Sequence, residues 1–148
     1  METHKFPRVG TGVLILNDKN QVLLGLRHED KDKADSELHG EGTWTMPGGK
    51  LDWQETPRSG AIREMKEETG LSGKNLELIS VTNDAVVDHH FITIGFKCTE
   101  FEGEAQVLEP DEITEWKWYD LDSLPDKIFF PSKKLLDNYL AKRLYSDE

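Results

Sequence analysis

Cysteine and long apolar runs, which would place the chain in other classes of protein, are scarce or missing. The 148 residues include one cysteine, Cys98, which excludes an internal disulfide and suits a reducing compartment. No long apolar run occurs and residues 1–7 are mostly polar, so we expect neither a secretory signal nor a transmembrane span. We therefore expect a cytoplasmic protein.

Basic residues are also scarce. The chain has 18 Lys and Arg residues against 29 Asp and Glu residues, and its net charge of -11 argues against broad electrostatic binding to nucleic acid or to an anionic membrane. Hydrophobic residues make up 36% and charged residues 32% of the chain. These values and the length predict one domain, residues 1–148, with a sizeable core.

The most informative stretch runs from Gly48 to Leu71 and reads GGKLDWQETPRSGAIREMKEETGL. Its two glycines follow Met46 and Pro47, and this pattern predicts a turn whose backbone angles are closed to residues with a side chain.

A helix is predicted over residues 57–69. Thr56 can cap its start, and Pro57 suits the first helical position because an N–H has no partner there. Gly70 is a natural left-handed stop after the helix.

Three glutamates, Glu64, Glu67 and Glu68, share one face of this helix because they lie three and four residues apart. Like charges at these spacings repel, and clustered carboxylate oxygens are the ligands that Mg²⁺ and Mn²⁺ prefer. A solvated acidic surface, which glutamate runs usually form, is the alternative. The glycines, Glu55 and Arg63 at their fixed spacings favour the metal site.

The same stretch resembles the signature box of the Nudix hydrolases at every fixed position from Gly49 to Leu71. Residue frequencies make a chance match on the order of one in a million. The resemblance implies an α+β fold in which a mixed β-sheet is sandwiched between helices (α/β/α). It also implies Mg²⁺-dependent hydrolysis, with Mn²⁺ as a second usable ion, of a nucleoside diphosphate linked to another group X. A homodimer is common in the family.

The resemblance further assigns roles within the box. Glu64 and Glu68 are expected as the main metal ligands, with Glu67 as a ligand or as the base that activates water. A carbonyl oxygen of Gly48 or Gly49 is expected to complete the metal shell.

Two charged residues of the box, Arg63 and Glu55, are expected to be structural, because their opposite charges can pair and hold the loop on the helix. Gly49 shares this structural assignment.

A further carboxylate is expected from a loop downstream, since many family members have one. Glu112 fits best as this ligand or base, with Asp111 and Glu115 as alternatives. The stretch is acidic throughout, so a solvated loop is the other interpretation.

Candidate substrate contacts are Arg27 for a phosphate, Trp44 for stacking on a base, and Thr93 for lining the pocket. A core position is the alternative for Trp44, and a surface ion pair for Arg27. His89 and His90 point to opposite faces of a strand, so this pair predicts no metal site.

The rest of the chain predicts several strands and a closing helix. Strands are expected over residues 9–16, 21–27, 44–46, 76–83, 90–98 and 115–119, the first two as a hairpin around a turn at residues 17–20. Residues 28–42 predict a long loop, residues 101–110 an acidic linker or hairpin, residues 120–125 a turn, and residues 131–145 an amphipathic helix.

Missing residues also narrow the substrate. Family members acting on ADP-ribose typically have a proline about sixteen residues beyond the box, and dinucleoside-polyphosphate hydrolases often have a tyrosine nearby. Residues 72–109 contain neither, and the coenzyme A extension before the box is missing too. We expect a small-molecule nucleotide substrate, a nucleoside triphosphate ahead of a nucleotide sugar. A catalytically silent nucleotide sensor is the alternative, but the intact box argues against it.

Overall fold

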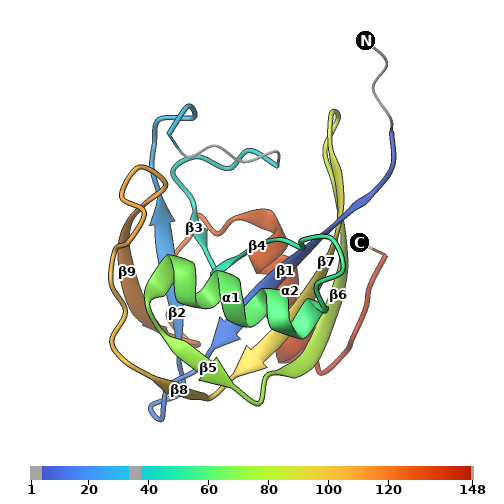
Figure 1. The fold of residues 1–148 in the computed structure, drawn as a ribbon. Helices are drawn as coiled ribbons and strands as arrows, with labels where there is room; N and C mark the ends of the chain where they lie inside the picture. Colours follow the sequence, from blue (N-terminus) through green and yellow to red (C-terminus); the bar gives the residue numbers. More distant parts are fainter. Residues whose placement is uncertain (1–4, 34–37, 148) are drawn as a thin grey trace.

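The computed structural model describes residues 5–33 and 38–147. Figure 1 shows their elements in the order β1 (Arg8–Ile15), β2 (Gln21–Arg27), β3 (Trp44–Thr45), β4 (Gly48–Lys50), α1 (Pro57–Thr69), β5 (Ser72–Lys74), β6 (Glu77–Ala85), β7 (His90–Cys98), β8 (Glu100–Glu102), β9 (Ile113–Asp120) and α2 (Phe130–Ala141). No helix among these residues is long and apolar enough to cross a membrane.

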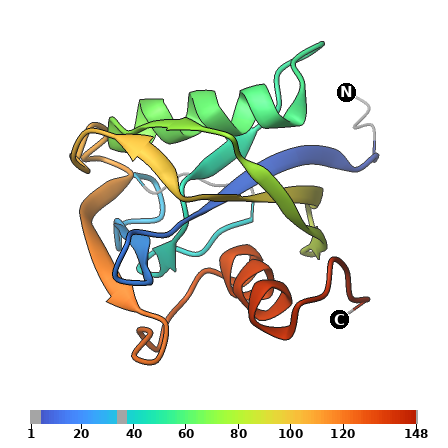
Figure 2. The same ribbon diagram turned by 90° about the horizontal axis from the view of Figure 1, so that it is seen from below.

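Strand β1 is an inner strand of a four-stranded sheet with the order β4-β1-β7-β6. It pairs antiparallel with β4 and parallel with β7, so the sheet is mixed. A second sheet has the order β3-β2-β9, and β5 pairs with β8 in a short ribbon. Figure 2 shows α1 on one side of the strands and α2 on the other. The expected α/β/α arrangement is confirmed.

Helix α1 has the predicted boundaries. The side chain of Thr56 accepts a hydrogen bond from the backbone N–H of Ser59 at 3.2 Å, and Gly70 ends the helix in the left-handed region at φ 82°. Ala61 and Met65 are fully buried in one of two core clusters. The local caps and the apolar face therefore fix this helix over the sheet.

The two core clusters lie on opposite faces of β1. Val13 and Ile15 belong to the cluster that contains Met65 of α1, whereas Leu14 belongs to the cluster that contains Leu135 of α2. Side chains alternate between the faces of a strand, so one short apolar run contributes to both cores.

The prediction that residues 9–16 and 21–27 pair as a hairpin is wrong except beside the turn that joins them. Leu16 and Val22 form an isolated antiparallel bridge beside the turn, but β1 and β2 then enter different sheets. Both edges of β1 are taken by β4 and β7, and both edges of β2 by β3 and β9. These longer-range pairings replace the local one.

The prediction that Gly48 and Gly49 form a turn with restricted backbone angles is also wrong. Both lie in β4, opposite Gly12 and Thr11, and neither has a positive φ. A Cβ atom on Gly48 would lie 2.1 Å from the carbonyl oxygen of Thr11, and one on Gly49 would lie 2.5 Å from Cδ of Glu64. Both positions therefore require glycine because atoms of Thr11 and Glu64 occupy the space that a Cβ atom would need.

The closing helix ends four residues earlier than predicted. Lys142 adopts a left-handed conformation at φ 55°, and the backbone N–H of Arg143 donates to the carbonyl of Asn138 at 3.0 Å. The chain then runs beside β6, where the backbone N–H of Val81 donates to the carbonyl of Leu144. An amphipathic pattern alone does not reveal this stop.

The long loop predicted over residues 28–42 has no helix or strand in its described parts, residues 28–33 and 38–42. Residues 34–37 lie outside the described residues. The strands β4, β5 and β8 were not predicted, and each spans three residues.

We expect Gly48→Ala to lower the free energy of unfolding by about 2 kcal/mol or more, because the added methyl group would overlap backbone atoms of β1. Urea unfolding would measure the change. Gly10→Ala is the matched control in β1, because the nearest contacts of its added Cβ, which include the carbonyl oxygen of Gly49, would lie at 3.6 Å. Equal losses in both variants would contradict the close-approach explanation.

Candidate active site

A cavity of about 480 Å³ is lined by residues from both helices and from the two larger sheets. Its volume is typical of small-molecule sites. The acidic part of the lining consists of Glu64, Glu67, Glu68, Glu109 and Glu112. Apolar side chains that line the cavity include Leu38, Phe91, Phe129, Pro131 and Leu135.

The backbone of β4 lies directly against two of the carboxylates. The N–H of Gly48 donates to Oε2 of Glu68 at 3.4 Å, and Gly49 leaves no room for a Cβ beside Glu64. The hydroxyl of Thr11 donates to the carbonyl oxygen of Gly49 at 3.3 Å. The strand and the helix carboxylates therefore form one site.

The predicted pairing of Arg63 with Glu55 is confirmed, and Arg63 has further partners. Its Nε and Nη2 atoms donate to the two carboxylate oxygens of Glu55 at 2.7 and 2.9 Å. Its Nη1 atom donates to Glu64 at 3.0 Å and to Glu67 at 3.2 Å. The guanidinium lowers the pKa of Glu55 to about 2 through these hydrogen bonds. Arg63 thus joins the loop before α1 to the carboxylates on α1.

Two carboxyl groups on α1 have raised pKa values. Burial raises the pKa of Glu68 well above the usual range, and the charges of Glu64 and Glu109 add to this rise. Burial also raises the pKa of Glu64, although the hydrogen bond from Arg63 opposes the rise. Without a cation, the site disfavours the charged forms of these carboxyl groups.

A tight turn before β9 brings two more carboxylates to the cavity. The carbonyl oxygen of Glu109 accepts from the backbone N–H groups of Glu112 and Ile113, both at 2.9 Å. Burial, and then the charge of Glu112, raise the pKa of Glu109. Glu112 was singled out from the sequence, and Glu109 was missed because it is one of several acidic residues around Pro110.

This set of donors fits a divalent cation. Five carboxylates line one cavity, and the raised pKa values of Glu64, Glu68 and Glu109 reflect burial and mutual repulsion. A hard cation with oxygen ligands, such as Mg²⁺ or Mn²⁺, would relieve that repulsion. Nudix enzymes generally use such metals.

Of the three candidate substrate contacts, Arg27 and Thr93 line the cavity. The guanidinium of Arg27 lies 4.8 Å from the centre of the Phe129 ring, and its Nε atom donates to the carbonyl of Gly40 at 3.0 Å. These contacts hold the side chain of Arg27 at the cavity wall.

The hydroxyl of Thr93 donates to Oδ2 of Asp84 at 2.6 Å. Asp84 is fully buried, and its other oxygen lies 3.0 Å from Nζ of Lys134 on α2. The buried charge is therefore paired, and it fixes the hydroxyl of Thr93. Sequence reasoning missed Asp84 because both faces of its strand are of mixed polarity.

Trp44 is not brought to the cavity. Its ring packs edge to face on Tyr119, with ring centres 5.1 Å apart, and it contacts the core cluster of α2. This is the core position named above as the alternative to stacking. Asp111 and Glu115 are likewise not among the described residues that line the cavity.

Comparison with known proteins agrees with this fold and site. Residues 6–139 match the family model described as NUDIX domain, and the chain belongs to this family. An RNA pyrophosphohydrolase from Zymomonas mobilis is 28% identical, with 91% of this chain and 93% of that protein covered. An ADP-ribose pyrophosphatase from Methanocaldococcus jannaschii is 31% identical, with 85% of this chain and 69% of that protein covered.

Solved structures give the same result. The crystal structure of a MutT NUDIX hydrolase from Burkholderia pseudomallei has a TM-score of 0.81 and 31% identity, covering 90% of this chain and 98% of that one. The chain is therefore a Nudix hydrolase, an enzyme that acts on acid anhydrides.

We expect Glu68→Gln to stabilise the metal-free protein at pH 8, by about 3 °C or more in Tm, because it removes a partly buried charge beside Glu64. The folded state raises the pKa of Glu68, so the parent loses stability as pH rises from the ordinary glutamate range through that raised pKa. The advantage of the variant should therefore shrink toward pH 4. Thermal unfolding in EDTA would measure it.

The same substitution should abolish most of the stabilisation that Mg²⁺ gives the parent. Glu104→Gln is the control, since Glu104 is exposed and is not part of the cavity lining. A destabilised Glu68→Gln variant that still responds to Mg²⁺ would contradict the assignment of Glu68 to a cation site.

Proposed function

We propose that the protein is a Mg²⁺-dependent pyrophosphohydrolase that cleaves a nucleoside triphosphate into a nucleoside monophosphate and pyrophosphate. The observation that carries this proposal is the division of the cavity lining into an acidic part and an apolar part. A nucleotide has the matching halves, a polyphosphate that binds cations and a base that packs against apolar side chains.

In this proposal, Glu64 and Glu68 hold the metal, with the carbonyl of Gly48 completing the shell. Gly49 is the less suitable carbonyl, because its oxygen already accepts a hydrogen bond from Thr11. Bound Mg²⁺ would supply positive charge to the phosphate oxygens and orient them. The chain cannot supply that charge broadly, given its net charge of -11.

Glu67 or Glu112 would activate the attacking water, since both line the same cavity. Each is a carboxylate that can take a proton from water held in line with the leaving oxygen. Arg63 donates to Glu67 and would hold it in position, whereas the turn from Glu109 to Ile113 holds Glu112. We assign Arg63 and Glu55 a structural role, and Glu109 a place beside the metal ligands.

The apolar part of the cavity would hold the base and sugar. Phe91 and Phe129 line it, and Thr93 offers a hydroxyl whose own proton is donated to Asp84, so it can accept a hydrogen bond there. Arg27 offers the charge that a phosphate requires at the cavity wall.

A nucleotide sugar is the alternative substrate, because it contains the same phosphoanhydride and an equally polar second half. The names of the relatives add two others, the 5′ end of RNA and ADP-ribose. The acidic chain argues against RNA, and the missing proline downstream of the box argues against ADP-ribose.

A substrate panel tests the proposal. Nucleoside triphosphates, nucleotide sugars, ADP-ribose and 5′-triphosphorylated RNA would be incubated with Mg²⁺, and products identified by chromatography. We expect fastest turnover of a triphosphate, with pyrophosphate released, and at least about a 10²-fold lower kcat in Glu68→Gln. Sugar phosphate as the main product would move the assignment to nucleotide sugars. Nucleotide binding without turnover would favour the silent sensor.

The downstream carboxylate has its own test. We expect Glu112→Ala to lower kcat by roughly 10²-fold, as removal of a general base does, with a smaller effect on the Mg²⁺ requirement. Asp111→Ala is the matched control, because it is the adjacent carboxylate and is not among the cavity-lining residues. Equal activity of both variants would contradict a catalytic role for Glu112 and favour the interpretation of this stretch as a solvated loop.

A further inference from the structure

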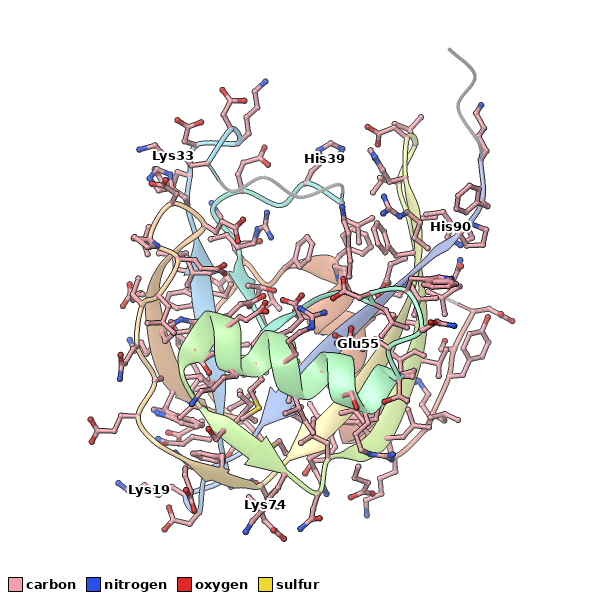
Figure 3. All side chains as sticks on the ribbon, viewed as in Figure 1. Lys19, Lys33, His39, Glu55, Lys74 and His90 are labelled. Carbon is pink, nitrogen blue, oxygen red and sulfur yellow. The ribbon has the colours of Figure 1, made fainter. Side chains whose placement is uncertain are left out.

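A second group of possible metal ligands lies outside the five carboxylates. His39 precedes β3, whereas Asp88 and His89 lie in the turn between β6 and β7, about fifty residues further on. Figure 3 shows His39 on the side of the molecule where the β6–β7 turn projects. One ligand atom from each of the three residues lies within 4.8 Å of the other two.

The distances within this group are long for charge-assisted hydrogen bonds and also fit metal coordination. Nε2 of His39 lies 3.3 Å from Oδ1 of Asp88, and Nδ1 of His89 lies 3.4 Å from the same oxygen. Charge-assisted N–H···O hydrogen bonds are shorter, about 2.7–2.9 Å. Ligand atoms about 2.0–2.1 Å from a tetrahedral ion lie roughly 3.3 Å apart, and both distances to Oδ1 of Asp88 match this spacing.

We propose that His39, Asp88 and His89 bind a Zn²⁺ ion that links the segment before β3 to the β6–β7 turn. Two imidazoles and a carboxylate form the donor set that zinc accepts, with water in the fourth position. Mg²⁺ prefers oxygen ligands, so this site and the glutamate cluster select different ions. All three side chains are partly exposed and therefore accessible to the ion.

The ion would fix two walls of the cavity. Leu38 is adjacent to His39, and Phe91 is two residues beyond His89; both side chains line the cavity and are at most 9% exposed. A cross-link between these segments would hold both walls in position. This effect does not depend on which nucleotide the cavity binds.

The sequence argument treated His89 and His90 as neighbours on one strand, but β7 begins at His90 and His89 lies in the turn before it. His90 instead contacts Oδ1 of Asn83 on the neighbouring strand through its Nε2 atom. Of the other two ligands in the group, Asp88 is adjacent to His89, whereas His39 comes from a distant segment that the sequence alone does not place beside them.

Zinc affinity of the untagged protein tests the proposal. Zn²⁺ would be titrated against a chromophoric chelator, with Mg²⁺ in large excess to occupy the glutamate cluster. We expect one bound Zn²⁺, and affinity at least about tenfold weaker in His39→Ala, His89→Ala and Asp88→Asn. His90→Ala is the matched control and should bind as the parent does. Glu68→Gln should also bind as the parent does.

Thermal unfolding gives a second readout and verifies that each variant folds. Zn²⁺ should raise the Tm of the parent and of His90→Ala, and raise it less in His39→Ala. The proposal is overturned if the parent binds no Zn²⁺ under these conditions, or if His39→Ala binds it equally well. It is also overturned if Glu68→Gln alone loses the ion, because zinc would then occupy the glutamate cluster. The substrate panel tests Mg²⁺-dependent hydrolysis independently, so failure of the zinc proposal and failure of the proposed function can be told apart.

Discussion

Repulsion between carboxylates on one helix face is the constraint on which the site depends. Arg63 offsets part of this repulsion, because its guanidinium donates hydrogen bonds to Glu55, Glu64 and Glu67. The carboxylate of Glu68 instead accepts a hydrogen bond from the backbone N–H of Gly48. Arg63 therefore offsets part of the charge of the cluster, and in the proposed function a cation would offset the rest. The raised pKa of Glu68 reflects this division.

The cavity itself exists because β1 and β2 diverge. They share a turn and one bridge, and then join different sheets. Gly48 and Gly49 let β4 run tightly against β1 and bring its backbone beside the carboxylates of α1. Both core clusters include side chains of β1, so the strand that supports the site is also the best-buried one.

Features fixed by nearby residues were predictable from the sequence. The boundaries of α1 follow from Thr56 and Gly70, and the pairing of Glu55 with Arg63 follows from the spacing of the box. Features that depend on distant residues were not predictable. The glycines of β4 are explained only once β1 and α1 are beside them, and the early end of α2 depends on pairing of Leu144 with β6.

The polar residues that sequence analysis missed also depend on contacts with distant residues. Asp84 has one near partner, Thr82, but its other partners lie on β7 and α2. His39 meets Asp88 across 49 positions of the chain. Their sequence neighbours give no sign of these contacts, because hydrophobic periodicity and short motifs report only local geometry. The alternating pattern predicted a strand only as far as residue 83, one residue before Asp84, and gave no sign that the charge of Asp84 is buried.

The two parts of the cavity therefore depend on different kinds of contact. Three of the five carboxylates in the acidic part, Glu64, Glu67 and Glu68, come from one short stretch with fixed spacing, so the family and its chemistry can be read from that stretch. The apolar part is assembled from Leu38, Phe91 and Phe129, which come from three separate segments. Small changes in any segment can reshape that part while leaving the carboxylates in place. Relatives of similar identity accordingly have names with different substrates, RNA in one case and ADP-ribose in another. A contact that fixes two of these segments to each other, as the histidine group would, then bears on substrate choice more than on the bond that is cleaved.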